Sequence, residues 1–160
     1  PGGRATSKAP RPANPKPNNL PVPHVEGKYN VSFSGLKTAV LNAVNQAEMR
    51  GETVNVADMA ASFEHRIDEI LADKLLAAAK DTGASTLCLA GGVAANSLLR
   101  CLVNEGAQKL GARLCLPAVE FCGDNGAMIA SQGFYELQSG NVAGLDLNGL
   151  PTLPIDYNCG

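Results

Sequence analysis

Three residues in the segment AGGVAAN have the chemistry to bind a nucleotide-sized ligand, namely Gly91, Gly92 and Asn96. Paired glycines remove side chains, so the backbone can approach a flat or anionic ligand closely. Asn96 both donates and accepts hydrogen bonds, which suits a ribose or a base edge, and the helix start after it offers backbone N–H groups. The alternative interpretation is structural: the glycines permit a tight turn and close helix–strand packing, and Asn96 is an ordinary helix N-cap.

Asp124, in the segment EFCGDNGA, is the second candidate. It is either a cap for the helix that begins near Gly126 or an oxygen ligand for a metal ion. A catalytic ion usually has three or more protein ligands, and the two histidines, His24 and His65, lack HxxxH spacing. The residues alone therefore indicate an incomplete metal site. His65 lies off the apolar stripe of its helix, so we expect it on the surface.

Alternating strands and helices must position these two segments. STLCLA (85–90) and RLCLPA (113–118) are predicted to be buried strands, followed by helices from about 96 to 109 and from 126 to 138. Strand–helix repeats of this kind predict an α/β fold with a largely parallel sheet. In open α/β sheets, ligands bind beyond the carboxyl ends of the strands, where both candidate segments lie.

The preceding region is predicted to contain a helical pair. Tyr29, Val31 and Phe33 alternate with polar residues and indicate a short strand, after which Ser34 resembles an N-cap. A helix should then run to the break at 50–52. The next helix, from 58 to about 81, carries apolar residues at three-and-four spacing, and Gly83 should stop it: Phe63, Ile67, Ile70, Leu71 and Leu75.

The composition is that of one ordinary α/β domain, because 45% of the 160 residues are apolar and 18% are charged. No apolar stretch approaches the ~20 residues of a membrane span, and no signal segment opens the chain. The five cysteines show no CxxC spacing, which favours a reducing compartment, and we expect a cytoplasmic protein. Cys88 and Cys115 are predicted to be small core residues.

Residues 1–28 form a proline-rich, extended strap with five basic residues and one acidic residue. Such a strap could contact a polyanion, although a solvated strap is the simpler interpretation. We expect an α/β lobe over 29–140 and an irregular tail over 141–160.

Three motifs resemble the C-terminal half of the bacterial TsaD/YgjD (Gcp, glycoprotease-like) family of tRNA N6-adenosine threonylcarbamoyltransferases. They are SFSGLKTAV (32–40), AGGVAANSLLR (90–100) and FCGDNGAMIA (121–130), in the family's order and spacing. The opening PGG resembles the family's PGGP turn, and the proline-rich strap resembles the family's next segment. The resemblance covers the chain from its start to about residue 150.

The resemblance implies one lobe of an actin/Hsp70/hexokinase-like (ASKHA, ribonuclease H-like) nucleotide-binding fold, with the active site between two lobes. It implies transfer of threonylcarbamoyl from threonylcarbamoyl-adenylate to N6 of the tRNA adenosine next to the anticodon. An ATP-like or adenylate ligand would contact Gly3, Ser7 and Asn96 beside the glycine pair. A divalent metal of the iron or zinc class would be held by Asp124 and by two histidines of an HxxxH motif outside this chain.

Expected partners are tRNA, the N-terminal lobe of the same enzyme, and TsaB- and TsaE-like proteins, with no membrane. This chain alone is expected to be inactive. Arg4 stands where the family has proline, and Gly123 where threonine is common. The alternative is a degenerate non-catalytic paralogue that acts as an interaction subunit. The intact GGVAAN and DN motifs argue against that alternative, because a scaffold does not need them.

Overall fold

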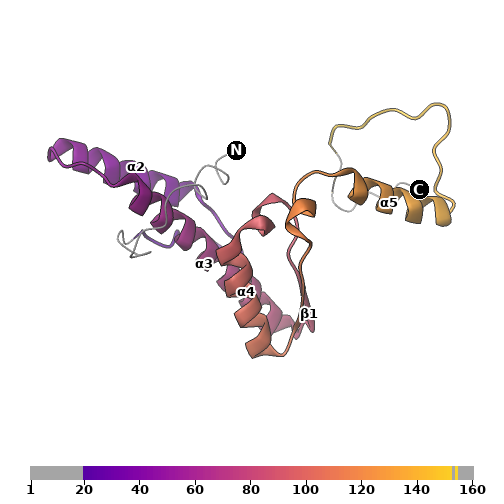
Figure 1. Cartoon of the computed structure of the whole chain (residues 1–160), viewed down its shortest axis with the longest axis horizontal. Helices are drawn as coiled ribbons and strands as arrows, with labels where there is room; N and C mark the ends of the chain where they lie inside the picture. The colour runs from indigo at the N-terminus through magenta and orange to yellow at the C-terminus, as the bar shows by residue number, and fades with distance from the viewer. Residues whose placement is uncertain (1–19, 153, 155–160) are drawn as a thin grey trace. The chain divides into compact units, whose positions relative to one another are not determined.

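The structure is a computed structural model that describes residues 20–152 and 154 (Figure 1). The chain divides into two compact units between Cys122 and Gly123, and each is treated by itself. The first unit is a mixed α/β arrangement, as expected. Its elements are α2 (Ser34–Met49), α3 (Val56–Thr82), β1 (Thr86–Cys88), η1 (Gly92–Ala95), α4 (Ser97–Leu110), β2 (Arg113–Cys115) and η2 (Val119–Phe121).

The sheet of the first unit consists of β1 and β2, which pair in parallel with Leu87 opposite Leu114. The parallel pairing confirms the α/β prediction, although both strands are shorter than their apolar runs. Leu87 is buried, while its neighbours on β1 face the opposite way. This alternation corrects one expectation: Cys88 is exposed rather than a core residue, and Cys115 is half-buried.

Helix α3 is the longest element, and its two ends explain its bounds. The Asn55 side chain accepts hydrogen bonds from the N–H groups of Ala57 and Asp58, so the helix begins two residues earlier than predicted. At the other end Gly83 has φ +67°, a left-handed conformation that favours glycine. The predicted stop at Gly83 is confirmed.

Small residues allow α3 and α4 to pack closely in the first unit (Figure 1). A Cβ added at Gly106 would lie 2.1 Å from Leu76 Cδ1, so only glycine fits there without rearrangement. Nine of the buried apolar side chains form three clusters that follow α3 from its start to its end: Leu20, Leu36 and Met59; Ala72, Leu99 and Val103; Ala79, Leu87 and Ala107.

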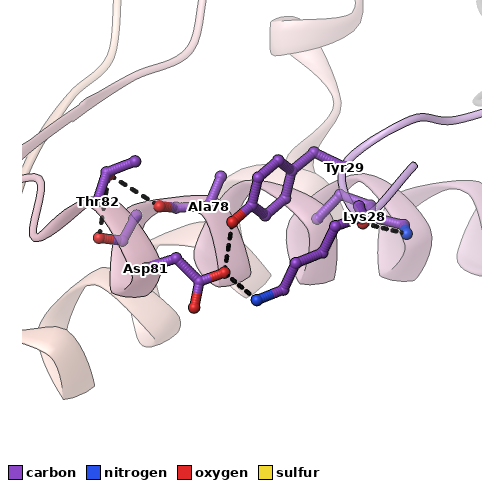
Figure 2. Close-up of polar contacts among 7 residues, drawn as sticks. Lys28, Tyr29, Ala78, Asp81 and Thr82 are labelled. Atoms are coloured by element: carbon purple, nitrogen blue, oxygen red, sulfur yellow. Dashed lines mark hydrogen bonds and ion pairs between the residues drawn. The ribbon is translucent and has the colours of Figure 1, made fainter.

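The predicted strand over 29–33 is wrong, because this segment has no regular structure. Side chains rather than a partner strand hold it: the Tyr29 hydroxyl and Lys28 Nζ both contact the Asp81 carboxylate near the end of α3 (Figure 2). These contacts lower the pKa of Asp81. Ser34 is also not the N-cap, since α2 begins at Ser34 itself and Phe33 precedes it without a side-chain cap.

The second unit contains α5 (Gly126–Gln138), whose bounds match the prediction. Asn125 caps it by accepting a hydrogen bond from Met128 N–H at 3.0 Å. Within this unit α5 buries none of its residues, and its apolar side chains are exposed. The described part of the tail, 141–152 and 154, has no helix or strand. Among the residues that the structure describes, no helix has the length and apolarity needed to cross a bilayer.

Candidate functional site

The glycine junction connects β1 to α4 through Gly91, Gly92 and the short helix η1. Gly91 has φ +82°, which explains why glycine stands there. Gly92 does not have a positive φ, and a Cβ added at either glycine would meet nothing within 4 Å. Close helix–strand packing therefore does not explain this pair. Neither the backbone nor the described neighbours require Gly92 to lack a side chain, and the surface above both glycines is open.

Asn96 is the N-cap of α4, as the structural interpretation predicted. Its Oδ1 accepts hydrogen bonds from Leu98 N–H at 2.8 Å and Leu99 N–H at 3.1 Å. These two amides are consequently not available to an anion, which corrects the expectation of an open helix N-terminus. Exposed glycine backbone beside a half-buried carboxamide suits the flat, uncharged part of a nucleotide better than its phosphates.

The carboxamide of Asn96 is oriented by a residue that the sequence analysis missed. Asn96 Nδ2 donates to Glu64 Oε1 of α3 at 2.8 Å. One turn further along α3, Asp68 is 1% exposed, and its Oδ2 has no hydrogen-bond partner among the described residues. The sequence did contain a sign of this arrangement: Glu64 and Asp68 are carboxylates four residues apart, on a helix with a stripe of apolar residues.

Burial raises the pKa of Asp68 to about 7, and the negative charge of Glu64 adds to this rise. A hydrogen bond from the Asn96 side chain acts in the opposite direction, because it stabilises the ionised form. Asp68 thus changes charge near neutral pH next to the candidate nucleotide contact.

Arg100 connects the glycine junction to the loop after β2. Its Nε donates to the Ala94 carbonyl in η1, and its Nη2 donates to the Pro117 carbonyl and contacts Cys122 Sγ at 3.3 Å. The planar guanidinium can donate in several fixed directions, so one side chain holds both loops. The sequence analysis quoted Arg100 in a motif but assigned it no role.

Asp124 belongs to the second unit and is exposed. Because Asn125 caps α5, the interpretation of Asp124 as the helix cap is wrong. Asp124 retains the chemistry of a metal ligand. However, the described residues contain no group of three His, Cys, Asp or Glu side chains that could hold an ion. These residues alone do not fit a complete metal site.

The other predicted residues have separate outcomes. Gly3 and Ser7 lie outside the described residues. His65 is not a surface residue, since its side chain is 17% exposed and its Nε2 lies 3.0 Å from Glu69 Oε1.

A cavity of about 380 Å³ lies at the start of α3, apart from every predicted site residue. Its lining comes from the end of α2, the loop after it and the first turn of α3: Ala43, Gln46, Ala47, Arg50, Glu52, Thr53, Val54, Asn55, Asp58 and Met59.

Comparison with known proteins agrees with the motifs. The family model "TsaD: tRNA N6-adenosine threonylcarbamoyltransferase" matches residues 1–131. A curated tRNA N6-adenosine threonylcarbamoyltransferase of Desulfitobacterium hafniense (strain Y51) is 48% identical over 154 residues, covering 96% of this chain and 45% of that protein. The protein of the same name from Bacillus subtilis (strain 168) is 40% identical over 159 residues, covering 97% of this chain and 45% of the relative.

The similarity extends over nearly the whole of this chain but over only part of each relative. The relative from Moorella thermoacetica is 40% identical over 159 residues, which is 98% of this chain and 46% of the relative. The chain therefore spans somewhat less than half the length of the curated relatives that it matches. Because the family model covers residues 1–131, with both junction segments inside it, this chain belongs to the TsaD family.

Proposed function

We propose that this chain is the C-terminal lobe of a tRNA N6-adenosine threonylcarbamoyltransferase with an ASKHA-type fold. The complete enzyme would transfer threonylcarbamoyl from threonylcarbamoyl-adenylate to N6 of the tRNA adenosine next to the anticodon. The observation that carries the proposal is the glycine junction. Both the backbone conformation and the packing at Gly92 would permit a side chain, yet the residue is glycine. The open surface above Gly92 lies beside the carboxamide of Asn96, which Glu64 orients.

The proposed roles follow from the chemistry of each residue. Gly91 and Gly92 let the adenosine moiety lie against the backbone, and Asn96 hydrogen-bonds to it. Gly3 and Ser7 would add further nucleotide contacts. Asp124 would supply one ligand to a metal of the iron or zinc class, which as a Lewis acid would polarise the transferred carbonyl. The remaining ligands, and the other wall of the site, would come from an N-terminal lobe, so the chain alone is inactive.

The test is a two-lobe protein, made by joining residues 1–160 to the N-terminal part of the D. hafniense relative. The assay contains threonylcarbamoyl-adenylate, tRNA, and TsaB- and TsaE-like proteins, and mass spectrometry of digested tRNA detects threonylcarbamoyladenosine. We expect product. The unmodified relative is the control. A folded two-lobe protein without product, beside an active control, would favour the non-catalytic interaction subunit.

Within the two-lobe protein, the sharpest substitution is Asn96→Ser. Alanine would remove the helix cap at a cost of about 1 kcal/mol, whereas serine keeps a capping oxygen and removes only the Nδ2 donor. We expect adenosine affinity to fall about tenfold, the loss of one hydrogen bond to the ligand, and the melting temperature to fall only slightly, because the bond from Asn96 to Glu64 is lost as well. Asn104→Ser, at an exposed position of α4, is the matched control. Equal affinity of the two variants would remove Asn96 from the binding site.

A further inference from the structure

One end of the first unit is rich in positive charge. Four exposed cations, named here the basic end, lie on four different parts of the chain: Lys28 before α2, Lys80 in the last turn of α3, Lys109 in the last turn of α4 and Arg113 at the start of β2. The chain as a whole has 13 basic and 15 acidic residues and a net charge of −2. A local excess of positive charge on such a protein attracts anionic partners.

The packing of α3 on α4 brings two of these cations to neighbouring helix ends. Ala79, the residue before Lys80, shares a buried cluster with Ala107 near the end of α4. The two helices therefore run in the same direction and end side by side (Figure 1). Lys109 follows Ala107 by two residues, so it lies at the same end of the unit as Lys80.

A hydrogen bond and an ion pair join the other two cations to this end. Arg113 N–H donates to the Ser85 carbonyl at 2.8 Å, in the loop that follows α3. Lys28 Nζ contacts the Asp81 carboxylate, which the Tyr29 hydroxyl also contacts, as Figure 2 shows. Lys28 thus compensates the charge of Asp81, and the other three cations remain in excess.

The fold explains only part of this charge. Cations are favoured in the last turn of a helix, which accounts for Lys80 and Lys109. That reason does not apply to Arg113, which begins a strand. Within the described part of the chain, none of these three side chains forms an ion pair. Cations spread over several elements suit a long polyanion with repeated phosphates better than a small anion.

We propose that the basic end binds phosphates of the tRNA stem whose loop is modified. The proposal rests on the proposed function, which brings a tRNA loop to the adenylate beside Asn96. Helix α4 begins directly after Asn96 and has Lys109 in its last turn, and its 14 residues span about 21 Å. A stem that continues from the bound loop reaches that far along the protein. Double-stranded RNA is recognised mainly through its phosphates and 2′-hydroxyls, so exposed cations are the groups required.

The test is the affinity of the two-lobe protein for an unmodified tRNA transcript, measured by fluorescence anisotropy at several salt concentrations without adenylate. The variant Lys109→Gln/Arg113→Gln removes two cations. We expect it to bind about tenfold more weakly at low salt, and the slope of log affinity against log salt concentration to become shallower by about 2, one for each phosphate contact. In the transfer assay the KM for tRNA should rise about tenfold with kcat unchanged, because neither side chain touches the reacting groups.

Lys37→Gln/Arg50→Gln is the matched control. It removes one exposed lysine and one exposed arginine as well, from α2 and its C-cap. Arg50 lines the cavity at the start of α3, so this pair lies away from the basic end. We expect the control to bind tRNA nearly as tightly as the unmodified two-lobe protein. Melting temperatures show whether both variants are folded.

The outcomes separate this inference from the proposed function. If the two double variants lose affinity equally, the attraction is one of net charge, and the basic end is not the tRNA site. If Lys109→Gln/Arg113→Gln binds tRNA normally while the two-lobe protein forms threonylcarbamoyladenosine, the inference is overturned and the proposed function stands. Normal tRNA binding with weakened binding of the TsaB-like protein would assign the basic end to a protein partner. If the unmodified two-lobe protein does not bind tRNA, both proposals fail.

Discussion

At the scale of single residues, Asp68 places a carboxyl group where its surroundings favour the neutral form. Its pKa of about 7 in the folded protein exceeds the ordinary value of 3.8, chiefly because of burial. The folded state therefore binds more protons than the unfolded state between about pH 4 and pH 7. In that window the stability falls as pH rises, by about 1.4 kcal/mol for each pH unit at most.

Asp68→Asn removes this dependence. We expect the free energy of unfolding of the variant, relative to the unmodified two-lobe protein, to increase by a few kcal/mol, at most about 4, from pH 4.5 to pH 8. Urea denaturation at several pH values measures it. Asn104→Ser, at an exposed position of α4, changes no titratable group and should differ from the unmodified protein by the same amount at every pH. Parallel curves for the two variants would contradict the raised pKa of Asp68.

At the scale of elements, the close contact of α3 and α4 depends on Gly106. A Cβ there would meet both terminal carbons of Leu76 and its Cγ at 2.9 Å or less. Leu76 is partly buried against the cluster at the end of α3, so moving its side chain would disturb that packing. The helix bounds themselves were more predictable than this contact. Asparagine caps and glycine stops are local in sequence, and α5 was predicted residue for residue.

Gly106→Ala in the two-lobe protein should cost about 1–3 kcal/mol of unfolding free energy, the range for an overpacked core. Gly133→Ala is the matched control, because it also lies in a helix but a Cβ there meets nothing within 4 Å. That control should be neutral or stabilise by up to about 1 kcal/mol. Denaturant midpoints measure both. An equal response would mean that α3 and α4 are not closely packed at Leu76.

Some interactions could not be predicted from the sequence because they join elements that are far apart in the chain. The strand expected over 29–33 rested on alternation, yet Tyr29 contacts Asp81, 52 residues away, and no ladder forms. Asn96 was identified from its motif, but Glu64 meets it only through the packing of α3 on α4. The roles of Gly91 and of the Asn96 cap were open alternatives that only backbone geometry could decide.

At the scale of the whole molecule, the described residues provide parts of a site rather than a complete one. The sheet has two strands, α5 buries no residue within its unit, and Asp124 stands without a cluster of metal ligands among the described residues. The chain also spans less than half of its curated relatives. Each observation is consistent with surfaces that a further lobe completes.

The metal content of the two-lobe protein tests whether an N-terminal lobe completes a metal site at Asp124. We expect the two-lobe protein to contain about one iron or zinc ion per molecule, and Asp124→Ala to lower this content and the transfer rate together. Asp146→Ala, another exposed aspartate of the second unit, is the control and should leave both unchanged. Plasma mass spectrometry gives the metal content. Full metal occupancy in Asp124→Ala would exclude Asp124 as a ligand.

Arg100 has a mechanical consequence for the first unit. Its guanidinium donates to the carbonyls of Ala94 and Pro117. The loop after β1 and the loop after β2 are thus hydrogen-bonded to the same planar guanidinium. Thermal motion should therefore displace the two loops together. Arg100 should therefore limit the backbone motion of Gly91 and Gly92, because it holds the carbonyl of Ala94 in the short helix that follows them.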